Sequence, residues 1–327
     1  MKNLKNIKNI LLTGGTGFLG TAFLKHLHEQ EFPCQVHVVS SGRTKFEVRE
    51  NSNISYIYHD LTRPAVHELI QDRSFDVLIH LATSSTLGPK SSEFVKFDDI
   101  QKIDRAVLDI ALKFKCSNVI WASSGAVYGS PEIKKPFKEN DRLVLGDLAH
   151  ESAYRIGKIQ SEYRAQKFCE EYGINLCIVR LFAFSGEDLP LNVHFALGNF
   201  IRDAILKKQI NITGTGMAVR SYMDQSDFAR ILTQIVLAGS AAPKVLNVGA
   251  ADSYTLKEVA DKVAVNFYEN FGHQVDVLIH NKAQDADSFY VPDTNRLISF
   301  LNNKRFIDLD TSIKKMIEFA IPKFNTE

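Results

Sequence analysis

Near its beginning the chain reads Asn9-Ile10-Leu11-Leu12-Thr13-Gly14-Gly15-Thr16-Gly17-Phe18-Leu19-Gly20. An apolar strand that ends in glycines and passes directly into a helix aims backbone N–H groups and the helix dipole at one point, which suits a pyrophosphate. Gly14 permits the tight turn, Gly17 lets phosphates approach without a Cβ in the way, and Gly20 lets helix and strand pack closely. With Phe18 and Leu19, these residues form the predicted cofactor turn. A glycine-rich turn without a ligand is the alternative, which the strand-turn-helix context disfavours.

The first half of the chain alternates short apolar strands with amphipathic helices, as is typical of a parallel sheet covered on both faces. Strands are expected at Asn9 to Leu12, Gln35 to Val39, Ile54 to His59, Phe75 to Ala82, Asn118 to Ser123 and Asn175 to Leu181. Helices are expected at Phe18 to Glu29, Pro64 to Ile70, Asp98 to Phe114 and Glu151 to Tyr172. The pattern predicts an α/β protein with a Rossmann-type doubly wound parallel sheet.

After about Phe182 the alternation loosens, and the helices are separated by longer polar loops. This change predicts a dinucleotide-binding domain at residues 1–182 and a smaller, mostly helical substrate-binding lobe at residues 183–327. Segments such as Val245-Leu246-Asn247-Val248-Gly249 could still return to the main sheet.

The composition is that of an ordinary soluble globular protein, with 45% hydrophobic and 24% charged residues among 327. Lys+Arg 39 balances Asp+Glu 38, so there is no electrostatic reason to expect nucleic acid or an anionic membrane as partner. No stretch approaches the ~20 apolar residues that span a bilayer, and no secretory signal is recognisable, so a cytoplasmic location is expected. The four cysteines lack C-x-x-C spacing; we expect buried free thiols and no metal site.

The residues that indicate chemistry are Ser124, Tyr154 and Lys158. Tyr154 and Lys158 are one helical turn apart, so both side chains leave the same face and the ammonium favours the phenolate form of the tyrosine. Such an oxygen can take or return a carbinol proton while a nicotinamide cofactor moves the hydride. Tyr163 and Lys167 repeat this spacing, and we interpret them as a solvated helix face. Tyr154 is preferred because it begins the helix and follows the Ser124 segment more closely.

The end of the second expected strand indicates which nicotinamide cofactor binds. An acidic residue there would hold the ribose 2′-hydroxyl of NAD, but the chain reads Val38-Val39-Ser40-Ser41-Gly42-Arg43. Ser40 and Arg43 suit a 2′-phosphate, so NADP(H) is favoured over NAD(H), the alternative being that Arg43 points to water. Asp60 and Leu61 end the third strand, where they could bracket the adenine. Ala82 ends the fourth, at the mouth of the crevice where such sheets bind ligands.

Taken together, these motifs resemble the extended short-chain dehydrogenase/reductase family, the branch of sugar-nucleotide epimerases, dehydratases and ketoreductases. The resemblance runs nearly end to end. It rests on the glycine turn and on His80-Leu81-Ala82, Ala122-Ser123-Ser124-Gly125-Ala126-Val127-Tyr128-Gly129, Tyr154-Arg155-Ile156-Gly157-Lys158, Gly214-Thr215-Gly216 with Arg220 and Asp227 downstream, and Asn247-Val248-Gly249.

The resemblance implies a role for each matching residue. Ser124 would hydrogen-bond the reacting sugar oxygen, Tyr154 would be the acid/base, and Lys158 would hold the nicotinamide ribose. Asn199 and Arg220 look like the positions that grip the diphosphate of a nucleoside-diphosphate sugar, the alternatives being a helix cap and a surface ion pair. Phe182 would stack near the nicotinamide, although core packing explains an aromatic there equally well. The family also implies a homodimer through the helices at Asp98 to Phe114 and Glu151 to Tyr172.

Departures from the family pattern bear on the reaction. In the family's dehydratases an Asp-Glu pair follows the catalytic hydroxyl, and here Gly125 and Ala126, which cannot move a proton, take those positions. This argues against a 4,6-dehydratase and weakens a decarboxylase. Hydride transfer at C4 of the hexose remains, by a 4-ketoreductase, which the missing second-strand acid favours, or by a 4-epimerase, which the serine segment resembles. The two are nearly equal. A non-catalytic NADP(H)-binding sensor is a further alternative, disfavoured because Ser124, Tyr154 and Lys158 are all present.

Overall fold

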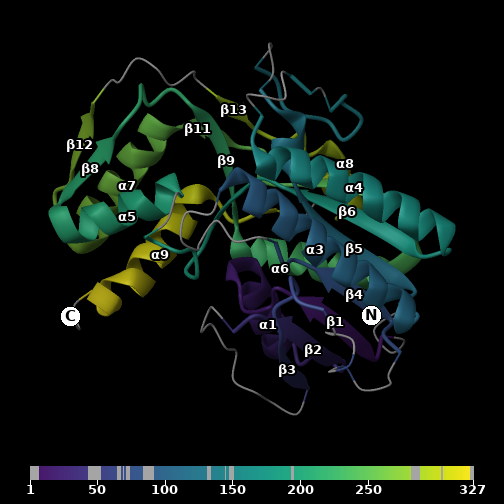
Figure 1. The fold of residues 1–327 in the computed structure, drawn as a ribbon. Coiled ribbons are helices and arrows are strands. Elements are labelled where there is room, and N and C mark those ends of the chain that lie inside the picture. Colours follow the sequence, from purple (N-terminus) through teal and green to yellow (C-terminus); the bar gives the residue numbers. More distant parts are fainter. Residues whose placement is uncertain are drawn as a thin grey trace. The chain divides into compact units, whose positions relative to one another are not determined.

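The structure, a computed structural model, describes residues 7–42, 53–64, 68, 70, 74–83, 92–130, 134–143, 145–146, 151–192, 195–280, 288–302 and 305–324. Its backbone forms two compact units (Figure 1). The first comprises Met1–Gly129, Arg142–Leu181 and Phe228–Leu246, and the second comprises Ser130–Asp141, Phe182–Asp227 and Asn247–Glu327. A junction between segments therefore falls between Leu181 and Phe182, beside the boundary expected from the sequence. The description as two consecutive domains stays a prediction.

A seven-stranded parallel sheet organises the first unit, which confirms the expected fold class. Its order is β10-β6-β5-β4-β1-β2-β3. The strands are β1 (Asn9–Thr13), β2 (Gln35–Ser40), β3 (Ile54–Tyr58), β4 (Val77–His80), β5 (Asn118–Ser124), β6 (Asn175–Leu181) and β10 (Val245–Val248). The order reverses between β1 and β4, and the carboxyl ends of these two strands are where a sheet of this kind offers a crevice.

Helices α1 (Phe18–Glu29), α3 (Glu93–Lys113), α4 (Ala153–Glu171) and α6 (Gln225–Ala238) accompany this sheet, and α3 packs alongside α4 (Figure 1). A short 3-10 helix, η2 (Gly125–Tyr128), follows β5 directly, and another, η4 (Gly239–Ala241), follows α6. Trp121, Leu78 and Leu11 from three neighbouring strands are fully buried in one cluster with Val107 of α3 and Ala165 of α4. Strands buried on both faces explain the nearly continuous apolar runs of the sequence.

The second unit combines short strands with helices. Strand β9 (Val219–Asp224) pairs with β7 (Ala183–Ser185), β11 (Ser253–Thr255) and β13 (Phe289–Tyr290), and β8 (Gln209–Ile212) pairs with β12 (Asp276–Ile279). The helices are α5 (Ala196–Lys207), α7 (Leu256–Phe271), α8 (Asn295–Phe300) and α9 (Leu309–Phe324). Helices α5, α7 and α9 pack against one another.

Helix ends differ from the expected ones where a side chain caps the backbone. Helix α3 begins at Glu93 rather than Asp98 because the Ser92 hydroxyl accepts a hydrogen bond from the Val95 N–H at 3.2 Å. Helix α4 begins at Ala153 rather than Glu151 because Ser152 caps it in the same way. The helix expected at Pro64 to Ile70 lies largely outside the described residues.

Candidate functional site

The glycine turn between β1 and α1 has the conformation expected of it. Gly14 has a φ of +76°, a left-handed conformation that favours glycine, and a Cβ added there would lie 2.6 Å from the backbone nitrogen of Ala82. A Cβ on Gly20 would lie 2.3 Å from the Gly14 carbonyl oxygen. The structure therefore brings the predicted cofactor residues Gly14, Gly20 and Ala82 together, and protein atoms alone explain why Gly14 and Gly20 lack side chains.

Gly17 differs from the other two glycines because protein packing does not account for it. Its φ is −82°, and a Cβ there would meet a single neighbour, the Gly14 carbonyl oxygen, at 3.3 Å. Gly17 is also the N-cap of α1 without a side-chain cap hydrogen bond, and the first turn, with Phe18 and Leu19, carries no acidic residue. An open approach to a helix N-terminus of this kind suits a pyrophosphate, so the residues present fit a dinucleotide.

Ser124, Tyr154 and Lys158 belong to two neighbouring elements of the first unit. Ser124 is the last residue of β5, and its buried hydroxyl caps η2 by accepting a hydrogen bond from the Ala126 N–H at 3.1 Å. Tyr154 lies partly exposed in the first turn of α4. Lys158 is 2% exposed, and its Nζ donates a 3.0 Å hydrogen bond to the carbonyl of Ala122, two residues before Ser124.

Arg155, which the sequence reasoning missed, fixes the same end of α4 to η2. Its Nε donates to the Ala126 carbonyl at 3.0 Å, and its Nη2 donates to the Val127 carbonyl at 3.4 Å. Glu151 forms an ion pair with the same guanidinium. Lys158 and Arg155 thus bind backbone carbonyls on both sides of Ser124. The motif did contain the signal, because Arg155 lies between Tyr154 and Lys158 in the sequence.

The second tyrosine–lysine pair is a solvated helix face, as interpreted from the sequence. Tyr163 is 64% exposed, and Lys167 forms an exposed ion pair with Glu170 at 2.8 Å. Tyr163 and Lys167 therefore supply a matched control for experiments on Tyr154 and Lys158.

A buried polar chain joins the ends of β1 and β4. The Thr13 hydroxyl lies 2.7 Å from His80 Nδ1 and accepts a hydrogen bond from the Ala82 N–H at 3.4 Å, and His80 Nε2 lies 3.5 Å from Asp104 Oδ1. Burial lowers the pKa of His80, and Asp104 offsets part of that effect. The neutral ring with its proton on Nε2 facing Asp104 would accept from Thr13 through Nδ1. His80 was quoted in the sequence motif, but its partner 24 residues later was missed.

At the end of β2, Ser40 supports the glycine turn. Its hydroxyl lies 2.6 Å from the Thr16 hydroxyl and accepts from the Gly42 N–H at 3.2 Å. Arg43, the other residue of the NADP(H) prediction, lies outside the described residues.

The predicted adenine residues Asp60 and Leu61 follow β3 and have different surroundings. Leu61 is buried in the core cluster of the sheet. The carboxylate of Asp60 accepts hydrogen bonds from the Thr62 N–H at 3.0 Å and the Thr62 hydroxyl at 2.8 Å, which closes the turn after the strand. Contact with adenine stays a prediction for both residues.

In the second unit, Arg220 contacts neutral groups. Its Nη2 donates to Ser288 Oγ at 2.7 Å, its Nη1 donates to the Ser288 carbonyl at 3.2 Å, and its guanidinium lies 5.7 Å from the centre of the Tyr290 ring. Burial lowers the pKa of Arg220, and the nearby Tyr222 and Tyr290 offset part of this decrease. Its described contacts thus differ from the surface ion pair considered as the alternative. A half-buried guanidinium held by neutral partners suits an anionic ligand.

Asn199 and Phe182 are both held by local contacts in the second unit. Asn199 lies in the first turn of α5, whose N-cap is Phe195, and its side-chain oxygen accepts a 2.9 Å hydrogen bond from Arg202. Phe182 packs with its ring centre 4.8 Å from that of Tyr290. The diphosphate role of Asn199 and the nicotinamide role of Phe182 stay predictions.

Comparisons with known proteins identify the family. The model of the NAD dependent epimerase/dehydratase family matches residues 10–249. The chain belongs to that family. The resemblance to extended short-chain dehydrogenases drawn from the sequence is thereby confirmed. The family consists of enzymes that use a pyridine nucleotide and modify sugar nucleotides, and it includes epimerases, dehydratases, decarboxylases and reductases.

Two curated relatives show the spread of reactions within the epimerase/dehydratase family. A dTDP-4-dehydro-6-deoxyglucose reductase of Escherichia coli is 24% identical over 94% of this chain and 96% of its own length. A UDP-glucuronic acid decarboxylase 1 of Danio rerio is 22% identical over 96% of this chain and 73% of its own length.

Solved structures of the family share the fold. A UDP-N-acetylglucosamine 4-epimerase from Methanobrevibacter ruminantium superposes with a TM-score of 0.81 at 20% identity, covering 97% of this chain and 99% of its own. A UDP-glucose 4-epimerase from Thermotoga maritima gives a TM-score of 0.78 at 19% identity over 97% of this chain and 99% of its own.

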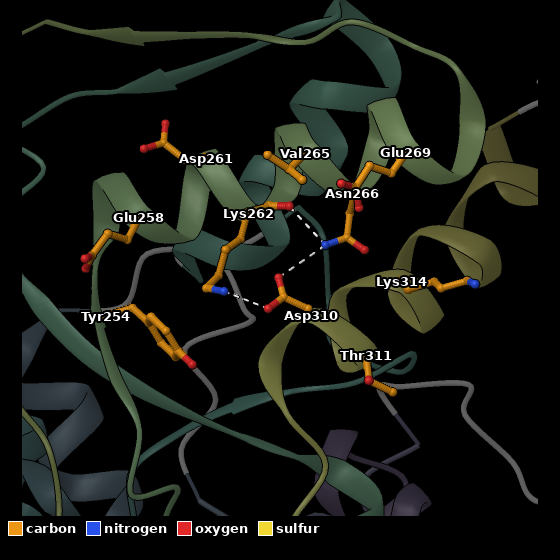
Figure 2. Close-up of a pocket in the computed structure, with 10 residues that line it drawn as sticks. All are labelled: Tyr254, Glu258, Asp261, Lys262, Val265, Asn266, Glu269, Asp310, Thr311 and Lys314. Atoms are coloured by element: carbon orange, nitrogen blue, oxygen red, sulfur yellow. Dashed lines mark hydrogen bonds and ion pairs between the residues drawn. The ribbon is translucent and has the colours of Figure 1, made fainter.

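A cavity of about 720 Å³ lies in the second unit, among α7, β11 and the start of α9 (Figure 2). Several of its charged side chains are engaged by neighbouring residues. Lys262 forms a 2.7 Å ion pair with Asp310 and lies 5.0 Å from the Tyr254 ring centre, and Glu258 accepts hydrogen bonds from Thr255, the cap of α7. Contacts of this kind are typical of a solvated groove. The volume of the cavity is therefore not sufficient reason to choose it as the candidate active site.

The described residues also bear on two other kinds of site. No group of three or more His, Cys, Asp or Glu side chains there could hold a metal ion. Among the helices of the same residues, none combines the length and the apolar character needed to span a membrane.

Proposed function

We propose that this enzyme is an NADP(H)-dependent 4-ketoreductase, which reduces the C4 carbonyl of a nucleoside-diphosphate keto-hexose to a carbinol. One observation carries the proposal. Helix α4, with Tyr154 and Lys158, is fixed to the end of β5, where Gly125 and Ala126 follow Ser124. Gly125 and Ala126 carry no side chain that could move a proton, so we assign the donation of a proton or hydrogen bond to the sugar oxygen to the hydroxyls of Ser124 and Tyr154.

The residues divide the reaction between them. The bound nicotinamide supplies the hydride that reaches C4. Tyr154 gives its phenolic proton to the oxygen at C4, so that one hydride and one proton convert carbonyl to carbinol. Ser124 donates a hydrogen bond to that oxygen, and the ammonium of Lys158 stabilises the phenolate left on Tyr154 while holding the nicotinamide ribose. Arg220 binds the diphosphate of the substrate.

The residues at the end of β2 favour reduction over epimerisation, because the two reactions use the cofactor differently. A reductase must exchange spent NADP for NADPH at every turnover, whereas an epimerase regenerates its cofactor and profits from holding NAD tightly. The segment Ser40-Ser41-Gly42 offers no carboxylate for the ribose hydroxyl of NAD. A reductase, 24% identical over 94% of this chain, is among the relatives, beside decarboxylases that match a similar share.

A 4-epimerase is the second candidate, because Ser123-Ser124-Gly125-Ala126-Val127-Tyr128-Gly129 resembles the corresponding segment of sugar 4-epimerases. Dehydratase and decarboxylase activities would each need a carboxylic acid after the serine, and Gly125 and Ala126 provide none. A non-catalytic NADP(H) sensor would not need Ser124, Tyr154 and Lys158 together.

The deciding experiment supplies the purified protein with NADPH and nucleoside-diphosphate 4-keto-6-deoxyhexoses, and follows the nicotinamide absorbance and the mass of the sugar nucleotide. We expect NADPH consumption matched by the gain of two hydrogen atoms in the product. Inversion of a nucleoside-diphosphate hexose at C4 without net NADPH use would establish the epimerase. Release of carbon dioxide from a nucleoside-diphosphate uronic acid, or loss of water from the hexose, would refute both readings.

We also infer a homodimer that forms through α3 and α4. These helices pack against each other, and α3 exposes large apolar side chains, with Phe94 77%, Val95 42% and Leu112 42% exposed. Exposed apolar groups gathered on a helix pair are typical of an association surface. Light scattering on the wild-type protein should give a dimer, and Phe94→Glu should give a monomer. A monomeric wild-type protein would contradict the inference.

A further inference from the structure

A small cavity lies where β2 and β3 end, about 380 Å³ in volume, within the first unit. Its wall is formed by Ser41, Tyr58, His59, Asp60 and Arg63. Carboxyl ends of neighbouring parallel strands are where a sheet of this kind receives the adenosine half of a dinucleotide. The cavity therefore adjoins the end of β2, whose residues predict a preference for NADP(H) over NAD(H).

The turn after β3 holds the backbone of Arg63 at this cavity. The Arg63 N–H donates to the Asp60 carbonyl at 2.9 Å, and the Arg63 carbonyl lies 3.3 Å from His59 Nε2. The Asp60 carboxylate closes the same turn by accepting from the N–H and the hydroxyl of Thr62. The described contacts of Arg63 thus use its backbone, and Arg63 is an exposed residue of the cavity wall.

The groups around the cavity suit a phosphate better than a ribose hydroxyl. Ser41, which follows β2, lines the cavity. The hydroxyl of the preceding residue, Ser40, already contacts Thr16 and Gly42. A guanidinium can bind a phosphate through two parallel hydrogen bonds, and a serine hydroxyl can add a third. Asp60 is the one carboxylate of the wall, and two hydrogen bonds from Thr62 already engage its Oδ1.

We propose that Arg63, presented by the turn after β3, is the side chain that recognises the 2′-phosphate of NADP(H), with Ser41 as its partner. The inference rests on the proposed function and names the residue that gives that site its cofactor preference. It places the selectivity for NADP(H) on the turn after β3 in addition to the end of β2.

The test measures binding directly, by the fluorescence of NADPH and NADH and by competition with 2′,5′-ADP and 5′-AMP. We expect Arg63→Ala to weaken the binding of NADPH and 2′,5′-ADP by roughly ten- to a hundred-fold, as for the loss of a hydrogen-bonded charge. The affinities for NADH and 5′-AMP should stay within about two-fold of the wild-type values. Arg63→Lys should recover part of the loss. Arg105→Ala is the matched control, because Arg105 is an exposed arginine of the same unit that pairs with Asp109 at 3.0 Å. Thermal unfolding checks that each variant is folded.

The outcomes separate this inference from the proposed function. If Arg63→Ala weakens the binding of NADPH and NADH equally, or changes neither affinity, Arg63 does not recognise the 2′-phosphate. If Arg43→Ala alone abolishes the preference for NADPH, that role belongs to Arg43. Wild-type protein that binds neither nucleotide would instead overturn the proposed function, and Arg63 with it.

Discussion

Lys158 and Ala122 are joined by a 3.0 Å hydrogen bond from the ammonium to the backbone carbonyl, with the lysine 2% exposed. Since an ammonium has three donors, this bond fixes the side chain and leaves donors for a ribose. Ala122 is two residues from Ser124, so the bond ties the lysine of α4 to the strand that carries the serine. The position of the Lys158 ammonium is thus fixed by a backbone carbonyl. Substitutions of neighbouring side chains would leave that carbonyl in place.

Replacement of Tyr154 by phenylalanine tests the proposed acid. We expect Tyr154→Phe to lower kcat by about 10²- to 10⁴-fold, because the proton donor is lost, while NADPH binding stays within about two-fold. Tyr163→Phe, on the exposed face of the same helix, should leave both quantities unchanged. Steady-state kinetics and nucleotide titration check this. Full turnover by Tyr154→Phe would remove the tyrosine from the mechanism.

The glycines of the turn should respond differently to the same added methyl group. Gly17→Ala meets the Gly14 carbonyl oxygen at 3.3 Å, so we expect a folded protein that binds NADPH at least about ten-fold more weakly. Gly20→Ala places a Cβ 2.3 Å from that oxygen, and should lower the free energy of unfolding by about 1–3 kcal/mol. Denaturant titration and nucleotide binding separate the two effects. Equal losses of stability would contradict the assignment of Gly17 to the ligand.

The buried ion pair of Arg180 with Glu162 should matter for stability. Arg180 donates to Glu162 at 2.9 and 2.7 Å and to the Tyr128 hydroxyl at 2.8 Å. Burial alone would lower the pKa of Arg180, but Glu162 and Tyr128 raise it above its usual value.

Glu162→Gln removes the charge that compensates this guanidinium, so we expect a loss of about 3–5 kcal/mol in denaturant unfolding. The exposed pair of Arg105 with Asp109 is the control, and Asp109→Asn should cost less than about 1 kcal/mol. A small effect at Glu162 would mean that water reaches Arg180.

The chain should lose stability in mild acid through His80. Because burial lowers the folded-state pKa of His80, the unfolded chain binds its proton more readily than the folded one. The stability that depends on neutral His80 is present above the unfolded pKa of about 6.5 and is lost as the pH falls below it.

Thermal unfolding between pH 7 and pH 5 should show this loss, and His80→Gln, which does not titrate, should flatten the dependence. His28→Gln, at an exposed position of α1, should leave it unchanged. An unaltered pH dependence in His80→Gln would show that the loss arises elsewhere.

The thiols should be unreactive in the folded protein. Burial raises the pKa of Cys34 to about 11 and that of Cys116, Cys169 and Cys177 to about 12, and all four are free and buried, as expected from the sequence. Since the thiolate is the nucleophile, a disulfide reagent at neutral pH should label these thiols only after denaturant is added. Rapid labelling of a native thiol would reveal local opening.

Local sequence patterns predicted the parallel sheet and the elements that carry the candidate site residues. The glycine turn, the parallel strands and the pair of Tyr154 with Lys158 depend on residues a few positions apart, and each lies on the element expected. The start of α3 was missed because its first turn exposes Phe94, which conceals the helical pattern that the Ser92 cap stabilises.

Contacts between distant segments could not be predicted. Arg220 meets Ser288 across 68 residues, and Arg155 meets Ala126 across 29. Neither spacing leaves a periodic signal, because folding of the chain, rather than local geometry, brings these residues together. The proposed role of Arg63 was not predicted for a related reason, because no local pattern indicates that the turn closed by Asp60 brings Arg63 to the cavity.

The two compact units each consist of three chain segments that alternate along the sequence. No single cut can therefore release either of them intact, and neither could be exchanged with a relative by one crossover between genes. New substrate preferences in such a protein must arise by substitutions or loop insertions within an unbroken polypeptide. The glycine turn and the Tyr154 helix would then be inherited along with whatever sugar the rest of the chain comes to bind.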